Sequence, residues 1–435
     1  MNLHLSGGLR WLYPGMRVKR WALLALFSTG LVVFALLEIV GKERIREIYR
    51  FVPENEVARF ALIGLLIVVG VVGFAVGVSR LVRSVARGVA PLKEEKPSDL
   101  IYRTRVLEKA PHVVAFGGGT GLSTLLRGLK KVTSNLTAVV TVMDDGGSSG
   151  RLRSELDVLP PGDVRNCILA LAEDEWRIER FFQHRFCGTS DFDGHSLGNL
   201  LLVGMEQVTG GFDRAIEEMC SILDVRGRVL PATLAKTHLV AQMADGEWVE
   251  GESRITADPR RIKRIELSAQ SVDPYNRVLE AIADADLILL GPGSLFTSLI
   301  PNLLVEGIAV AIEEAAAEKL LVANLMTQPG ETTAFTLCDH LRILNEYISI
   351  RCFDSVVINT TLPSEALLAG YQEESAEPVK DDLIEENAYD LKVIHADLLG
   401  TIELEGKPTV KHDSHKLARV IVRHTRAFSR SVLSP

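Results

Sequence analysis

The sequence holds little of what a disulfide-linked or zinc-binding protein needs. Its five cysteines are odd in number, lie far apart and never form a C-x-x-C pair, so neither a disulfide framework nor a structural zinc site is indicated. A reducing compartment fits this cysteine usage best. The cysteines are Cys167, Cys187, Cys220, Cys338 and Cys352.

A basic surface large enough for nucleic acid is also missing from most of the chain. Residues 91–435 hold 36 Lys and Arg against 51 Asp and Glu, whereas residues 1–90 hold 12 against 5. Neutralising a phosphate backbone needs clustered Lys and Arg. The excess of acids in residues 91–435 therefore predicts no nucleic-acid partner. The length of 435 residues and the 47% share of apolar residues predict two or more structural units with a large core.

Two runs without any charge, at residues 21–37 and 60–79, lie within residues 1–90, which we call the head. A bilayer span needs about 20 apolar residues. We therefore predict a membrane anchor over residues 1–87 with two transmembrane helices, at about 21–40 and 60–79. A cleaved signal peptide is the alternative for the first run, and a buried globular helix is the alternative for both.

The anchor also predicts the side of the membrane on which the rest of the chain lies. Two spans return the chain to its starting side, and Lys and Arg precede the first span and follow the second. The connector holds five basic residues as well, so the positive-inside contrast is modest. We expect a two-pass protein of the cell membrane with both ends in the cytoplasm and a polar linker at residues 88–111.

The body at residues 112–435 alternates apolar strands with helices. Residues 112–131 and 285–305 each read as strand, glycine turn and helix. This alternation predicts an α/β domain with a Rossmann-like, mostly parallel sheet and helices on both faces. Two alternating runs that meet at Asp245 and Gly246 predict a hairpin outside the main sheet.

The polar, glycine-rich segments follow the strands, which is where an open α/β sheet binds its ligands. The turn after the first strand reads FGGGTGLS, and N–H groups at the start of a helix suit a phosphate. The turn lacks the third glycine of the dinucleotide fingerprint and the Lys of a Walker loop, so a merely tight turn is the competing interpretation. The candidate binding residues here are Gly117, Gly118, Gly119, Thr120 and Gly121.

The second strand ends in MDDGGSSGR, where two carboxylates precede a Gly/Ser loop. Asp144 lies 23 positions after Gly121, loosely where a dinucleotide fold binds the ribose. Both carboxylates would alternatively help to hold Mg²⁺, with the Ser and Arg side chains on phosphate oxygens. A solvated turn competes with both interpretations. The candidates are Asp144, Asp145, Gly146, Gly147, Ser148, Ser149 and Arg151.

Two later segments offer polar side chains at helix starts. Asp163 in PPGDVRN is either a helix N-cap or a ligand-binding group, and Arg165 and Asn166 stand in the same first turn. His195 and Asn199 in HSLGN are four residues apart and share one face of a helix. A lone histidine is usually structural, and no second histidine at ligand spacing supports zinc.

Two more strand ends complete the set of candidates. GPGSLFTS is another glycine turn into a helix, in which Ser294 is a good N-cap and Thr297 a donor to phosphate. NLMTQPGET follows the next apolar strand. The candidates are Gly293, Ser294, Thr297, Asn324 and Thr327.

Six ordered motifs together resemble the gluconeogenesis-factor (YvcK) branch of the CofD-like superfamily over roughly residues 112–425. They are GGGTGLSTLLRGLK, MDDGGSSGRLR, PPGDVRN, HSLGNLLL, GPGSLFTSLIPNLLV and NLMTQPGET. The resemblance implies a Rossmann-like fold in which the Gly turn at 117–121, Asp144, Asp145, the GGSSGR loop, Asn199 and the GPGS turn form a nucleotide-sugar cleft. The two predicted spans depart from the soluble form usual in this branch.

The resemblance implies two functions of different classes. The branch is associated with growth on gluconeogenic carbon sources, with cell shape and wall synthesis, and with binding UDP-sugars such as UDP-N-acetylglucosamine. A better understood relative, the 2-phospho-L-lactate transferase, joins a nucleotide-activated phospholactate to a deazaflavin alcohol with Mg²⁺. A transferase is therefore the alternative, and whether any reaction is catalysed stays open. The broken dinucleotide fingerprint disfavours an NAD(P)-dependent oxidoreductase.

We therefore expect a membrane-tethered α/β protein that binds a nucleotide-sugar and regulates the supply of wall precursors. Its expected partners are this ligand, the membrane and enzymes of wall-precursor supply, and a homo-oligomer stays open. No cofactor is required by this interpretation, and Mg²⁺ is the one ion that the sequence suggests.

Overall fold

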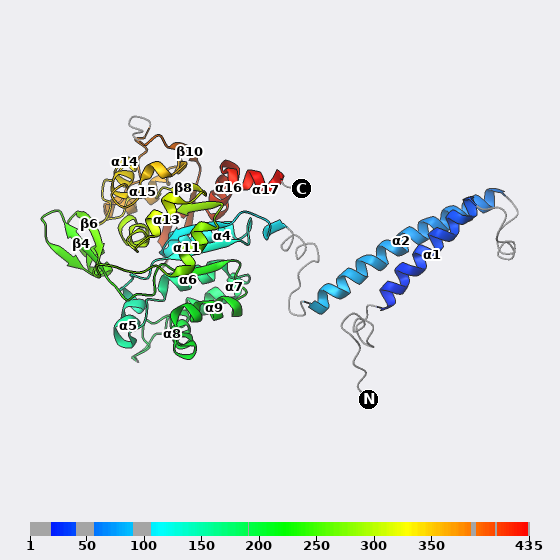
Figure 1. Cartoon of the computed structure of the whole chain (residues 1–435), viewed down its shortest axis with the longest axis horizontal. Coiled ribbons are helices and arrows are strands. Elements are labelled where there is room, and N and C mark those ends of the chain that lie inside the picture. The colour runs from blue at the N-terminus through cyan, green and yellow to red at the C-terminus, as the bar shows by residue number, and fades with distance from the viewer. Residues whose placement is uncertain are drawn as a thin grey trace. The chain divides into compact units, whose positions relative to one another are not determined.

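The computed structural model describes residues 19–40, 56–89, 106–189, 191–383, 389–404 and 407–433 (Figure 1). The chain divides into two compact units, residues 1–104 and 105–435, and each is described by itself.

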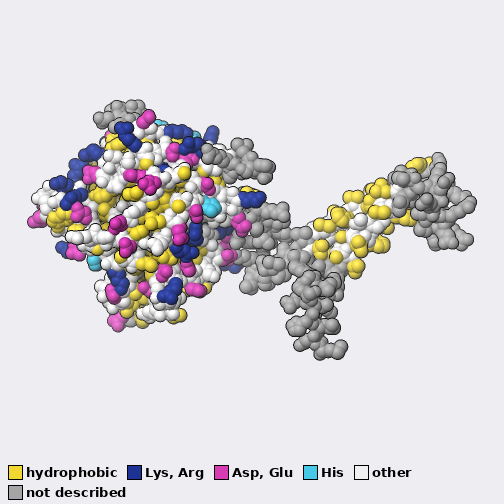
Figure 2. Space-filling view, viewed as in Figure 1, with side chains coloured by type: hydrophobic (Ala, Val, Ile, Leu, Met, Phe, Trp, Pro, Cys, Tyr) yellow, Lys and Arg dark blue, Asp and Glu magenta, His cyan; other side chains and the backbone are white. Residues whose placement is uncertain are grey.

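The first unit is a pair of packed apolar helices, α1 (Lys19–Val40) and α2 (Glu56–Val89). Gly73 and Gly77 of α2 lie against Ser28 and Ala25 of α1, where an added Cβ would crowd the neighbouring helix. Small residues at such a seam let two backbones approach closely. The other faces of both helices expose their apolar side chains, as Figure 2 shows.

One unbroken helix among the described residues is long and apolar enough to cross a bilayer. It is the 22-residue stretch Phe60–Leu81 of α2, which matches the second predicted span. The apolar part of α1, Trp21–Leu36, is shorter than a full span. The membrane anchor and its two-pass arrangement both stay predictions.

The second unit contains a seven-stranded sheet in which every neighbouring pair is parallel. Its order is β10-β9-β8-β7-β1-β2-β3. The chain thus moves outward from β1 in one direction, then returns to β7 on the other side of β1. The strands are β1 (Val113–Gly117), β2 (Leu136–Val140), β3 (Arg228–Pro231), β7 (Leu287–Leu290), β8 (Glu318–Val322), β9 (Ser355–Asn359) and β10 (Lys392–Ala396).

The central strands are almost entirely apolar because helices cover the sheet (Figure 1). Every residue of β1, β2 and β7 is buried. The predicted α/β class with a Rossmann-like parallel sheet is confirmed. The helices are α4 (Gly119–Leu129), α5 (Gly147–Leu156), α6 (Gly162–Leu171), α7 (Glu175–Phe182), α8 (Leu197–Thr209), α9 (Phe212–Ile222), α11 (Asn276–Ala283), α12 (Ile300–Leu303), α13 (Ile308–Glu314), α14 (Leu337–Leu344), α15 (Glu365–Glu373), α16 (Ser414–His424) and α17 (Arg426–Leu433).

Two small antiparallel sheets stand beside the main one. The predicted hairpin at Asp245 and Gly246 is confirmed: it joins β4 (Leu239–Met243) to β5 (Trp248–Glu250), and β6 (Ile262–Leu267) pairs with β4. The short helix α10 (Glu252–Ala257) follows β5. The second small sheet is the hairpin of β11 (Leu399–Leu404) and β12 (Lys407–His412).

The contact between α4 and α16 depends on one glycine. A Cβ on Gly128 would overlap the carbonyl oxygen of Ser414 and lie 2.9 Å from the Cβ of Ala418. We expect Gly128→Ala to lower the free energy of unfolding of residues 105–435 by about 1–3 kcal/mol, because overpacking forces the helices apart. Urea denaturation measures this change.

Gly204 in α8 provides the matched control for that substitution. A Cβ there would meet nothing within 4 Å, so Gly204→Ala should raise the stability of the helix by roughly 0.5–1 kcal/mol. Equal effects of the two substitutions would contradict the close α4–α16 contact.

Candidate functional site

A cleft of about 460 Å³ opens at the carboxyl ends of the central strands. Its walls come from the loops that follow β1, β2, β7 and β8, together with residues of α10 and β12. The order of strands reverses between β1 and β7, and ligands of open α/β sheets bind at this kind of switch point. The position of the cleft is therefore the one that the topology favours.

The glycine turn after β1 forms one wall of the cleft, through Gly118, Gly119, Thr120 and Gly121. A Cβ on Gly118 would lie 2.6 Å from Oδ2 of Asp163, so a side chain there would displace that carboxylate. The turn leads straight into the first residues of α4, whose N–H groups have no partner within the helix. This wall can therefore accept an anionic group.

The loop after β7 forms the facing wall, through Gly293, Ser294 and Thr297. Asn324 holds it from the end of β8, since its Nδ2 donates to the Gly293 carbonyl at 2.8 Å and its Oδ1 accepts from the Gly293 N–H at 3.1 Å. Ser294 caps the helical turn that follows by accepting from the Thr297 N–H at 3.2 Å. These side chains shape the loop as well as line the cleft.

Carboxylates gather in the cleft. Asp144, Asp163, Glu252 and Glu331 all line it. Burial, followed by the charge of Asp144, raises the pKa of Asp163 to about 6. Burial, followed by the charges of the other acids, raises the pKa of Glu252 to about 7, and burial also raises the pKa values of Asp144 and Glu331. The cleft therefore attracts protons or cations.

The chemistry of these oxygens fits Mg²⁺ at Asp144 and Asp163. Mg²⁺ is usually held by one or two carboxylates together with the phosphates of a ligand. No group of three or more His, Cys, Asp or Glu side chains in the described part of the chain could hold a metal alone. Asp163 also lies against the glycine turn, where a phosphate would bring the remaining oxygens.

Asp145 does not lie in the cleft with Asp144, contrary to the expectation for a paired metal site. Its Oδ1 accepts from the Ser253 N–H at 2.7 Å, at the start of α10. Consecutive side chains of an extended segment point to opposite sides, and Asp145 is directed toward the small sheet. By holding α10, Asp145 helps to place Glu252 in the cleft.

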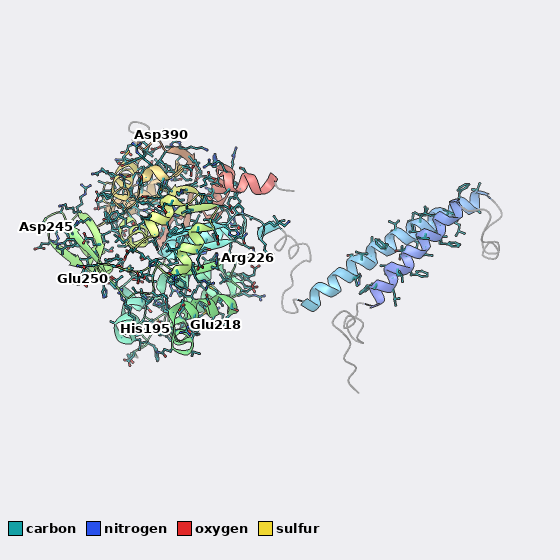
Figure 3. The ribbon with its side chains drawn as sticks, viewed as in Figure 1. His195, Glu218, Arg226, Asp245, Glu250 and Asp390 are labelled. Atoms are coloured by element: carbon teal, nitrogen blue, oxygen red, sulfur yellow. The ribbon has the colours of Figure 1, made fainter. Side chains whose placement is uncertain are left out.

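Ser148, a predicted binding residue, contacts His195 and Asn199, two others, whereas contact of the three with a ligand stays a prediction. Nδ1 of His195 lies 3.0 Å from Oγ of Ser148, and Nδ2 of Asn199 donates to that Oγ at 3.0 Å. All three are buried and none lines the cleft. Figure 3 places His195 beside α5 and α8, away from Asp245 and Glu250 of the small sheet.

Ser148 stands in a G-x-S-x-G pattern, Gly146 to Gly150, and contacts a histidine, which are features of a nucleophilic serine. Burial of both side chains outside the cleft gives the pair no access to a substrate. The arrangement instead fixes the start of α5 against the start of α8. Ser149 is closer to the cleft, since its side chain donates to Asp144.

The other predicted residues outside the lining have structural contacts. Arg165 donates to Ser196 and to Oδ1 of Asn166, the latter at 2.8 Å. Arg151 donates to the Asp193 carbonyl. Thr327 pairs with the backbone of Glu377. Three glycines are likewise outside the lining: Gly117 ends β1, Gly146 caps α5 and Gly147 begins it.

Sequence reasoning missed several side chains of the cleft because their segments carry no glycine motif. Glu252 and Thr256 come from α10, and Lys411 and His412 come from β12. Lys411 is the one Lys or Arg among the described residues of the lining. His412 is buried, contacts the backbone of Ala323 and leaves its Nε2 without a partner among the described residues. Burial lowers the pKa of His412 to about 4, so the imidazole is neutral at pH 7.

Comparison with known proteins decides the family. The sequence profile of the CofD family, described as 2-phospho-L-lactate transferase CofD, matches residues 113–399. The chain belongs to the gluconeogenesis-factor branch of this family. A protein named gluconeogenesis factor from Bacillus subtilis is 46% identical over 312 residues, which cover 72% of this chain and 97% of that protein.

Two further relatives differ in how much of this chain they cover. A crystal structure of a Bacillus halodurans protein, 46% identical, superposes with a TM-score of 0.68 and covers 72% of this chain and 99% of its own. This share corresponds to about the length of the body, and the matched chain folds over that length in the crystal. A gluconeogenesis-factor relative from Nostoc sp. is 40% identical over 425 residues, which cover 95% of this chain and 92% of its own length.

The buried carboxyl of Asp163 makes stability depend on pH. Its pKa is about 6 in the folded protein and about 3.9 in an unfolded chain, so the folded state binds the proton more tightly. Stability should therefore fall as the pH rises from about 4 to about 6, by on the order of 3 kcal/mol from this group. We expect Asp163→Asn to remove that part of the fall in urea denaturation.

The exposed Asp284→Asn serves as the control and should leave the pH profile unchanged. A profile of Asp163→Asn identical to that of the wild type between pH 4 and pH 7 would contradict the raised pKa of this buried carboxyl.

Proposed function

We propose that the protein binds a nucleotide-sugar of the UDP-N-acetylglucosamine type in the cleft and regulates the supply of cell-wall precursors. In this role it supports cell shape and growth on gluconeogenic carbon sources. The observation that carries the proposal is the cleft at the β1–β7 switch point, with its glycine turn leading into α4. Membership in the gluconeogenesis-factor branch supports the physiological part.

The charges of the cleft define how a diphosphate would be held. The start of α4 and the positive charge of Lys411, a residue of the lining, would attract it, whereas the carboxylates would repel it. Mg²⁺ bound by Asp144 and Asp163 would neutralise the phosphates and screen these acids. His412 Nε2 offers the sugar or ribose a hydrogen-bond partner.

We further propose that the head anchors the protein in the cell membrane as a two-pass hairpin, with the body in the cytoplasm. The apolar span Phe60–Leu81 and the exposed apolar faces of α1 and α2 support this arrangement. Lipid-linked steps of wall synthesis take place at the membrane, so a tether would place the regulator near its partner enzymes. A protease that cleaves the C-terminus in intact cells would overturn this topology.

A transferase acting on a phospholactyl group is the alternative function. The description of the matching family and the carboxylates near the glycine turn favour it. In that case the cleft would bind a nucleotide-activated donor, with Mg²⁺ shared between Asp144, Asp163 and the phosphates, and would admit a deazaflavin alcohol.

Calorimetric titration of residues 105–435 separates the two functions. UDP-N-acetylglucosamine and GDP are titrated with and without Mg²⁺, and each mixture is then assayed for turnover. We expect the UDP-sugar to bind without turnover and Mg²⁺ to strengthen binding. GDP binding, together with transfer of the phospholactyl group from an added nucleotide-activated phospholactate to an added deazaflavin alcohol and release of the nucleotide, would establish the alternative, and binding of neither nucleotide would overturn both.

Lys411→Met tests the role of β12 in that binding. Loss of the cation should weaken UDP-N-acetylglucosamine about tenfold or more, because a hydrogen bond to a charged phosphate is lost. Lys392→Met is the matched control, since Lys392 is exposed in β10 and lies outside the cleft. Equal affinities of the two variants for UDP-N-acetylglucosamine would show that the phosphates bind away from Lys411.

A further inference from the structure

The C-terminal segment has a charge opposite to that of the body on which it packs. Residues 407–435 hold seven Lys and Arg against a single acid, Asp413, whereas residues 91–435 as a whole hold 36 against 51. Most of the segment forms β12, α16 and α17. A local cluster of one sign on a surface of the other sign indicates a partner of complementary charge.

The packing of α16 directs part of this charge to solvent. Leu417, Ala418 and Ile421 are buried, and α16 contacts α4. His415, Arg419 and Arg423 follow one another at four-residue spacing and therefore share another, exposed face.

No ion pair with a described carboxylate neutralises the arginines of this face. The side chains of Arg419 and Arg423 form no hydrogen bond or ion pair with any other described residue. Nζ of Lys131 lies 3.0 Å from Nε2 of His415, which extends the face onto the end of α4. Lys416, on a different side of α16, pairs with Asp397. We call Lys131, His415, Arg419 and Arg423 the basic row.

The end of α16 lies close to the beginning of the body. Arg426 and Ala427, just after α16, line the same cavity of about 810 Å³ as residues 108–112. Residue 106 is separated from the end of α2 at Val89 by 16 residues, which span at most roughly 55 Å when fully extended. The chain thus keeps the basic row within reach of whatever surface holds α2.

We propose that the basic row binds the anionic phospholipid headgroups of the membrane that α1 and α2 enter. This inference rests on the proposed membrane anchor but not on the proposed ligand of the cleft. Cytoplasmic leaflets are negatively charged, and each Lys or Arg near such a surface strengthens binding on the order of fivefold. An acidic protein surface is the competing partner, but the short connection to α2 favours lipid.

This contact would orient the body relative to the bilayer. Residues 108–112 lie at the amino ends of the strands, because Val113 begins β1, whereas the cleft lies at the carboxyl ends. With the basic row and residues 108–112 toward the membrane, the cleft stays open to soluble ligands.

Vesicle sedimentation of residues 105–435 tests the proposal without help from the anchor. The body is mixed with vesicles of phosphatidylcholine alone and with vesicles containing phosphatidylglycerol. We expect binding to the anionic vesicles only, weakened by salt. The double variant Arg419→Gln/Arg423→Gln should bind on the order of 25-fold more weakly, at about fivefold for each arginine.

Matched controls keep this result interpretable. Lys263 and Arg254 are exposed and have no ion pair with a described residue, so Lys263→Gln/Arg254→Gln removes the same charge elsewhere and should bind like the wild type. Urea denaturation of the double variant should match that of the wild type, which shows that its fold is intact.

Three outcomes would overturn the basic row as a lipid site. They are equal binding to neutral and anionic vesicles, equal loss in the control variant, and full retention in the Arg419→Gln/Arg423→Gln variant. Equal binding, which includes binding to neither kind of vesicle, is the outcome expected if the basic row binds an acidic protein. Carbonate extraction of the full chain tests the anchor separately, since release of the full chain would overturn the anchor whatever the body does on vesicles.

Discussion

The candidate site depends on the close approach of two loops at the switch point of the sheet. A Cβ on Gly121 would overlap the carbonyl oxygen of Pro292, so the turn after β1 and the loop after β7 touch where the strand order reverses. Asn324 holds the second loop through both polar atoms of its amide. Beside these two loops, the first residues of α4 line the cleft.

Electrostatics then determines what the cleft can do. Four carboxylates and one lysine are among the described residues of the lining, and burial with neighbouring charges raises the pKa values of Asp163 and Glu252 to about 6 and about 7. An anionic ligand would therefore bind more tightly together with protons or a cation that offsets the acids. A site of this kind responds to its ionic surroundings, a property that suits a regulator as well as a transferase.

The sequence predicted the features that depend on local backbone pattern. It did not predict those that depend on the direction of side chains. The apolar strands and the glycine turn predicted the parallel sheet and the wall formed by Gly118 to Gly121, because both depend on local pattern. Spacing did not reveal that Asp145 turns toward Ser253 or that Ser148 and His195 face each other. Lys411 could not be predicted either, because it lies 290 positions after Gly121 in the sequence and lines the same cleft only in the folded chain.

A crystal structure of residues 105–435 with UDP-N-acetylglucosamine and Mg²⁺ tests the central claim most directly. The account predicts a diphosphate between the Gly118–Gly121 turn and the loop at Gly293, with Mg²⁺ touching Asp144 or Asp163 and leaving Asp145 on Ser253. A diphosphate bound instead at the start of α5, against Ser148 and Arg165, would contradict it.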